Sequence, residues 1–172
     1  MIDISEPLSP TFVGCADSDG YIHDAQCVVY TGPDTRYTGK QICFGFNEDT
    51  LTIYDVTDKA NPNVLFRLGY QGSAYTHQGW LNADMSSLLL NDELDEQRGT
   101  TNGQRTRTYV WDITNLEAAF ESGRFDHPEV AIDHNLYRGN PAGAETLPSR
   151  TRTSPTTTLT YPTAALAFVS WI

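Results

Sequence analysis

Short runs of alternating hydrophobic and polar residues dominate this chain. The runs at positions 51–56 and 108–113 alternate with a period of two and are rich in β-branched and aromatic side chains. This pattern is typical of half-buried strands. Shorter runs of the same kind predict further strands over residues 11–14, 24–30, 41–46, 63–69, 78–81 and 87–90. Segments rich in Gly, Pro, Asn and Asp separate the runs and are expected to form turns. The pattern predicts an all-β protein.

Two segments depart from the strand pattern. Leu116–Glu121 follows Asn115, a residue type that favours helix N-termini, and we expect about one and a half helical turns there. Residues 92–107 are polar and lack periodicity, so we expect an exposed loop between the second and third strands of their unit.

A repeated combination of motifs runs through the chain. An Asp-hydrophobic-Ser/Thr triplet precedes a tyrosine-containing segment with one histidine, and this happens three times. The triplets begin at Asp3, Asp55 and Asp112, and His23, His77 and His134 follow 20, 22 and 22 residues later. Successive histidines are 54 and 57 residues apart. A fixed period of this size indicates one structural unit used repeatedly, and four short strands per unit match a β-propeller blade. We expect an incomplete β-propeller of about two and a half four-stranded units over residues 1–137.

The pattern stops near Tyr137. Residues 138–172 are dominated by Arg, Thr, Pro, Ser and Ala, and we expect an irregular tail of low order. A flexible tail and read-through into non-homologous sequence are competing explanations. Because the chain also opens on the end of a unit, we expect a fragment. An open ring would leave unpaired strand edges, which favour self-association.

Charge and hydropathy narrow the classes of partner. The chain has 11 Lys and Arg against 22 Asp and Glu, for a net charge of −11, and its acids are spread along the sequence. Such a surface repels phosphate backbones, so we expect no nucleic-acid partner. The N-terminus lacks the pattern of a secretory signal, and the longest apolar stretch, residues 164–169, is too short for a membrane span.

The cysteines raise the question of a disulfide. Cys27 and Cys43 lie in two strand-like runs joined by a turn-rich segment, so a hairpin would bring them together. A disulfide there would imply an oxidising compartment and would leave Cys15 as a free or intermolecular thiol. The competing interpretation is a pair of small buried hydrophobic residues.

At this level of detail the chain resembles a known family. Residues 51–62 resemble the LVIVD repeat, in which an apolar strand ending in Asp leads into a polar turn and a proline. Residues 21–27, 73–80 and 131–137 resemble the choice-of-anchor B proteins, some of which are labelled in fungi as regulatory P domains of subtilisin-like proprotein convertases. The resemblance implies a secreted or surface-attached β-propeller with LVIVD-type blades. The third copy lacks the proline turn, and the tail does not match.

The repeated histidines are the main candidate site. Equivalent positions in successive blades lie at equal radius around the axis, so His23, His77 and His134 would converge on a central channel. Imidazoles are common ligands of divalent metals, and we consider zinc and calcium. Glu48 and Glu93 follow two equivalent strands and could supply oxygen ligands or orient a histidine. The competing interpretation gives each histidine a structural hydrogen bond within its own blade.

Neighbouring residues receive weaker hypotheses. Asp24 and Asp133 adjoin two histidines but should face away from them in a strand. The aspartate of each triplet should accept backbone N–H groups of the following turn. The aromatic residues near the histidines could line a carbohydrate- or peptide-binding surface or simply fill space between blades; they are Tyr21, Tyr75, Trp80 and Tyr137.

No catalytic constellation is visible. The chain lacks Gly-x-Ser-x-Gly, His-Glu-x-x-His and a glycine-rich phosphate loop. The resemblance described above implies an extracellular or surface-associated module, and we expect it to bind a protein or carbohydrate ligand. The alternative is a metal-dependent hydrolase or lyase that uses the repeated histidines and acids.

Overall fold

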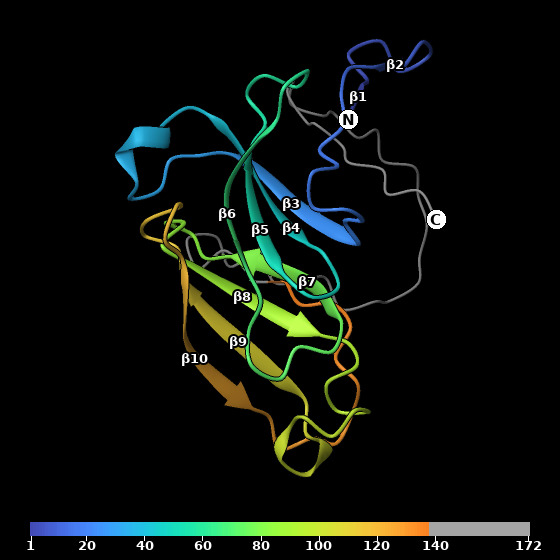
Figure 1. Cartoon of the computed structure of the whole chain (residues 1–172), viewed down its shortest axis with the longest axis vertical. Helices are drawn as coiled ribbons and strands as arrows, with labels where there is room; N and C mark the ends of the chain where they lie inside the picture. The colour runs from blue at the N-terminus through green and yellow to red at the C-terminus, as the bar shows by residue number, and fades with distance from the viewer. Residues whose placement is uncertain (138–172) are drawn as a thin grey trace, which may run out of the picture.

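The computed structural model describes residues 1–137 and is shown in Figure 1. The predicted irregular tail, residues 138–172, lies outside the described residues. The protein is all-β, as predicted: residues 1–137 contain no α-helix, and the helical segments found there are two single 3-10 turns, η1 (Thr35–Tyr37) and η2 (Asn102–Gln104). The strands are β1 (Ile2–Asp3), β2 (Thr11–Phe12), β3 (Asp24–Val29), β4 (Gln41–Phe46), β5 (Leu51–Asp55), β6 (Asn63–Leu68), β7 (Thr76–Leu81), β8 (Ser87–Asp92), β9 (Arg107–Asp112) and β10 (Phe120–Asp126).

These strands form three antiparallel sheets. A small sheet pairs β1 with β2, and two four-stranded sheets have the orders β3-β4-β5-β6 and β7-β8-β9-β10. Each larger sheet is a meander of consecutive strands, and the first lies above the second in Figure 1. No sheet formed by residues 1–137 closes on itself.

A shared hydrophobic core joins the two large sheets. Alternate side chains of a strand point to the same face, and those of four strands meet in one buried cluster. Its members include Ile42, Phe44 and Phe46 of β4, Leu51 and Ile53 of β5, Leu88 and Leu90 of β8, and Tyr109 and Trp111 of β9. Burial of each such side chain contributes about 1.5–3 kcal/mol. The alternating runs of the sequence thus become the two facing surfaces.

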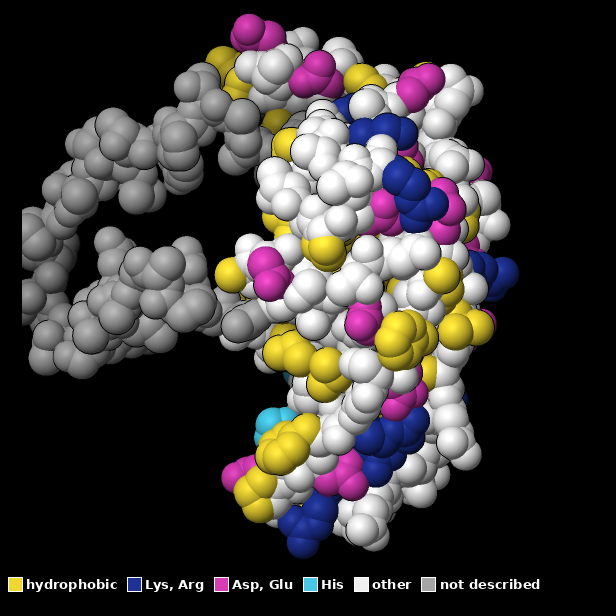
Figure 2. Space-filling model, turned by 90° about the vertical axis from the view of Figure 1, so that its left-hand side faces the viewer, with side chains coloured by type: hydrophobic (Ala, Val, Ile, Leu, Met, Phe, Trp, Pro, Cys, Tyr) yellow, Lys and Arg dark blue, Asp and Glu magenta, His cyan; other side chains and the backbone are white. Residues whose placement is uncertain are grey.

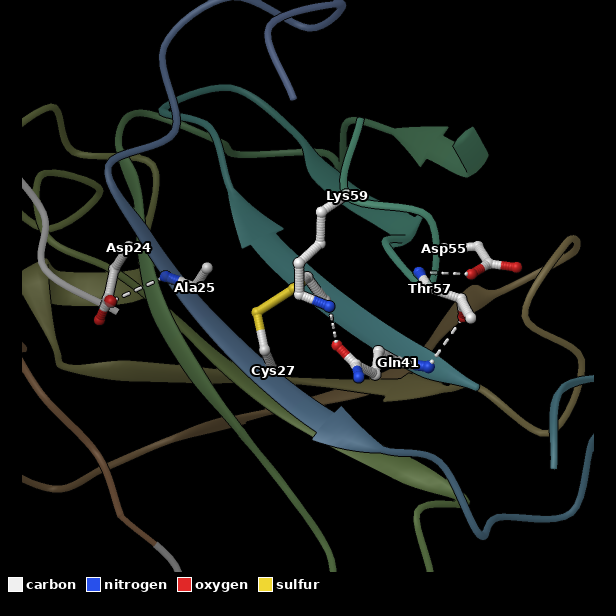
Figure 3. Close-up of a disulfide and its surroundings, with 8 residues drawn as sticks. Asp24, Ala25, Cys27, Gln41, Asp55, Thr57 and Lys59 are labelled. Atoms are coloured by element: carbon white, nitrogen blue, oxygen red, sulfur yellow. Dashed lines mark hydrogen bonds between the residues drawn. A yellow bond between two sulfur atoms is a disulfide. The ribbon is translucent and has the colours of Figure 1, made fainter. Parts of the chain in front are cut away.

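The other face of the first sheet is covered by the N-terminal segment. Tyr54 and Val56 form a second buried cluster there, against which Met1 and Ile22 pack. Cys27 of β3 and Cys43 of β4 are opposite each other in register and form a disulfide on this face (Figure 3). Cys15 is exposed and free.

Two of our predictions about elements need correction. Leu116–Glu121 is not helical: residues 115–118 form a turn, and Phe120 begins β10, which pairs with β9 with one register shift between Glu121 and Gly123. Residues 93–106 do connect the second and third strands of their sheet, but the loop is not wholly exposed, because Asp95, Glu96 and Thr101 are buried in it.

The triplet aspartates behave as expected. In each copy, Oδ1 of the aspartate accepts the backbone N–H two residues later, and the distances at Asp3, Asp55 and Asp112 are 2.8, 3.0 and 2.9 Å. The same side chain therefore starts the same turn in all three copies, which confirms the prediction for these residues.

The first strands of the two large sheets are neighbours. β3 lies beside β7, and the side-chain Oε1 of Gln26 accepts the Leu81 N–H at 2.8 Å. Glu48 and Thr76 form an isolated antiparallel bridge that ties the end of the first sheet to the start of β7. These contacts place the start of β3 next to the start of β7.

One face of the molecule carries a mixture of side-chain types. Acidic and basic side chains are interspersed on the face shown in Figure 2, and hydrophobic side chains form small groups there. Within residues 1–137, no helix has the length and apolar character needed to cross a bilayer.

Candidate metal centre

The structure brings the three repeated histidines into one row. His23 immediately precedes β3, His77 is the second residue of β7, and His134 lies in the extended segment after β10. The ring centroids of His23 and His77 are 4.5 Å apart, and those of His77 and His134 are 4.4 Å apart. Residues separated by 54 and 57 positions in sequence thus become direct neighbours.

Glu93 bridges two members of this row. One carboxylate oxygen lies 3.6 Å from Nε2 of His77, and the other lies 3.8 Å from Nε2 of His134. Each of the three residues offers a ligand atom within 4.8 Å of the other two. Ligand atoms around a tetrahedral zinc ion lie about 3.4 Å apart. The two separations from Glu93, 3.6 and 3.8 Å, are within a few tenths of an ångström of this value.

The protonation of His77 suits a metal ligand. Burial, reinforced by the nearby His23, lowers the pKa of His77 below its usual value. The ring is therefore neutral at pH 7 and keeps a lone pair for coordination. Among residues 1–137, its buried Nδ1 atom has no hydrogen-bond partner.

His23 and Glu48 lie beside this group rather than in it. The hydroxyl of Tyr75 is 3.1 Å from Nδ1 of His23, and that of Tyr21 is 3.3 Å from the same atom. Burial and the nearby Glu48 carboxylate raise the pKa of Tyr75. The group of ligand atoms is therefore His77, Glu93 and His134, a smaller set than the five residues considered from the sequence.

The aromatic residues divide into two pairs. Tyr21 and Tyr75 flank His23, and Tyr21 is half-exposed. Trp80 packs edge-on against Tyr137, with ring centroids 5.1 Å apart. The N–H of Leu136 is donated to Oε1 of Gln78 at 3.0 Å, so the segment carrying His134 is held against β7.

A second group of acids was missed in the sequence. Asp95 and Glu96 of the loop after β8 meet Asp133, and each has a ligand oxygen within 4.8 Å of the other two. Asp133 belongs to this acidic group and not to the group of His77, Glu93 and His134. Burial and neighbouring carboxylates raise the pKa of Asp95 to about 8 and that of Asp133 to about 9. No local signal in the sequence connects Asp133 with Asp95 and Glu96, which lie in a loop without periodicity.

Two comparisons with known proteins found no match for this chain. No protein-family model matches the chain, and a search of curated proteins finds no match. The function must therefore be inferred from the geometry and from the sequence motifs.

Proposed function

We propose that this chain is an extracellular or surface-associated β-propeller module of LVIVD type that binds a ligand and holds a zinc ion between His77, Glu93 and His134. The observation that carries the proposal is the row of repeated histidines with one carboxylate between two of them. Two nitrogens and one oxygen from three separate segments form a donor set that zinc accepts.

Blade architecture is favoured by two consecutive meanders that share one strand order. Each contains four strands, and their first strands, β3 and β7, are neighbours. In a propeller the first strands line the axis, which is where the histidines would then lie. The Cys27–Cys43 disulfide favours an oxidising compartment, in agreement with an extracellular location.

In this proposal, zinc has a structural role. The ion would tie β7 to the loop after β8 and to the segment around His134. The zinc ion would thereby fix the positions of the surrounding aromatic side chains, which would form the ligand-binding surface. The half-exposed Tyr21 is one accessible member of this surface.

Zinc titration of the full chain tests this proposal. After chelator treatment, calorimetry should detect one zinc ion per chain, and Glu93→Gln and His134→Asn should each weaken binding tenfold or more, roughly the effect of losing one ligand. Glu48→Gln is the matched control, because Glu48 follows the equivalent strand of the first sheet yet lies outside the group of ligand atoms. The zinc affinity of this variant should equal that of the wild type. Absence of zinc binding, or equal affinity in all four proteins, would contradict the proposal.

A metal-dependent hydrolase or lyase is the second candidate. Three protein ligands leave a coordination position for water, as in catalytic zinc sites. The discriminating assay incubates the zinc-loaded chain with ester, peptide and phosphoester substrates, or with substrates for elimination. A rate above that of free zinc in buffer, together with loss of this excess in Glu93→Gln, would favour the enzyme. A rate equal to that of free zinc would favour the binding module.

A further inference from the structure

The acidic group beside the zinc site carries its own inference. Asp95 and Glu96 are 0% and 3% exposed, and Asp133 is half-buried. Five carboxylate oxygens of this group are buried without a hydrogen-bond partner among residues 1–137: Oδ1 of Asp95, both oxygens of Glu96 and both oxygens of Asp133. None of the three carboxylates forms an ion pair within residues 1–137. Burial of so many unpaired oxygens is costly.

A neighbouring carboxylate shows how the same region satisfies an acid without an ion. Asp92 is fully buried, and its two oxygens accept hydrogen bonds from the Tyr70 hydroxyl and from the backbone N–H groups of residues 74, 75 and 94. Asp95 has one comparable donor, the Tyr109 hydroxyl at 2.8 Å on its Oδ2 atom. Glu96 has none. Hydrogen-bond donors therefore satisfy Asp92, whereas most carboxylate oxygens of Asp95, Glu96 and Asp133 lack a donor within residues 1–137.

We propose that Asp95, Glu96 and Asp133 form a calcium site, distinct from the zinc centre. Calcium prefers carboxylate and other oxygen ligands at 2.3–2.6 Å, so two oxygens on one ion are at most about 5 Å apart. The three ligand atoms lie within 4.8 Å of one another, which meets this limit. The absence of nitrogen and sulfur atoms from the group selects a hard cation over zinc.

The calcium site would also fix the segment that carries His134. Asp133 and His134 are consecutive and point to opposite sides, so Asp133 reaches the loop at Asp95 and Glu96 while His134 reaches Glu93. A cation at Asp133 would clamp residues 131–137 to the loop after β8. The calcium site itself does not depend on the presence of zinc.

Calcium titration of the chelator-treated full chain at pH 7.5 provides the test. Calorimetry with CaCl2 alone should show one ion per chain, and saturating calcium should raise the unfolding temperature by about 5 °C or more. Glu96→Gln and Asp133→Asn should each reduce calcium affinity at least tenfold. The control is Glu129→Gln, since Glu129 is an exposed acid near the same segment, and this variant should bind calcium as the wild type does.

The sign of the stability change separates a binding role from a structural one. In calcium-free buffer, Glu96→Gln should unfold at the same temperature as the wild type or higher, because a buried unpaired acid is gone; in calcium it should unfold at a lower temperature. Zinc affinity of Glu96→Gln, measured in parallel, should persist, so the outcome is separable from that of the zinc site. No calcium heat and no thermal shift in the wild type, or equal calcium affinity in Glu96→Gln and wild type, would overturn the proposal.

Discussion

At the scale of single residues, Gly79 is a position near the histidines where the two sheets are in close contact. It lies in β7, two residues after His77. A Cβ atom placed on Gly79 would lie 2.6 Å from the carbonyl oxygen of Leu89 and 2.6 Å from the ring of Phe46. The backbone oxygen cannot move without disturbing the pairing of β7 with β8. Glycine is therefore required there by space.

Gly79→Ala should destabilise the protein by about 1–3 kcal/mol, the usual cost of overpacking. Gly123→Ala is the matched control in β10, since no atom lies within 4 Å of its added Cβ. Urea unfolding of the two variants measures the difference. Equal unfolding midpoints for Gly79→Ala and Gly123→Ala would contradict the close contact of Gly79 with Phe46 and Leu89.

Residue-level predictions succeeded where the chemistry is local. The triplet aspartates start their turns with a side chain that reaches only two residues along the chain, so sequence alone sufficed. The grouping of Asp133 with other carboxylates was not predicted. The partners of Asp133 in that group, Asp95 and Glu96, come from a loop without periodicity, and nothing local could identify them.

At the scale of elements, a polar clasp joins the two large sheets. The segment at η1 connects β3 to β4, and the turn before β10 lies against it. Oδ2 of Asp34 accepts the Leu116 N–H at 3.0 Å, and Arg36 donates to Glu117 and Asn115, each at 2.7 Å. Tyr37 donates its hydroxyl hydrogen to Glu117. These hydrogen bonds therefore connect the two large sheets at the edge of the shared core.

Acid should weaken this clasp. The Arg36 guanidinium lowers the pKa of Asp34, and hydrogen bonds from Tyr37 and Arg36 lower that of Glu117. Stability from a lowered pKa is present above the unfolded pKa values, 3.8 and 4.5, and is lost as pH falls through the folded values. The free energy of unfolding should therefore decline below pH ~4.5.

Arg36→Gln should flatten part of that decline, because it removes the main group that lowers the pKa of Asp34 and one of the two groups that lower the pKa of Glu117. Arg98→Gln is the control: Arg98 is exposed and forms no ion pair within the described part of the chain. Denaturant unfolding between pH 3 and 7 measures both slopes. Parallel pH profiles for Arg36→Gln and wild type would contradict a role for the clasp.

The strand β10 shows why one element was mispredicted. Asn115 does start a turn, since its Oδ1 accepts the Glu117 N–H at 3.1 Å, as an N-cap would. The chain then leaves the turn at Phe120 to pair with β9. Pairing along a whole strand edge outweighs the weak helical preference of six residues, and that edge is formed by a distant part of the sequence.

At the scale of the whole molecule, the sequence period and the sheets are out of phase. The repeat was recognised from its triplets, but each large sheet begins at a histidine-bearing segment and has the triplet strand as its third member. The period therefore predicted which strands recur and which histidines are equivalent. Grouping into sheets depends on contacts such as the Glu48–Thr76 bridge, which the pattern does not encode.

The same distinction applies to the candidate site. Equivalence of the histidines was readable from spacing, and their approach to 4.5 and 4.4 Å agrees with it. The sequence could not show that Glu93, and not Glu48, lies beside His77 and His134, because both glutamates follow equivalent strands. This difference depends on the segment of His134, which passes the end of the second sheet.

Zinc K-edge X-ray absorption of the zinc-loaded full chain tests the central claim most directly. The account predicts two imidazole nitrogens at about 2.0–2.1 Å and one carboxylate oxygen, with the remaining position filled by water. Loss of one imidazole in His134→Asn should follow. A zinc ion bound without histidine, or one bound through the sulfur of Cys15, would contradict the account.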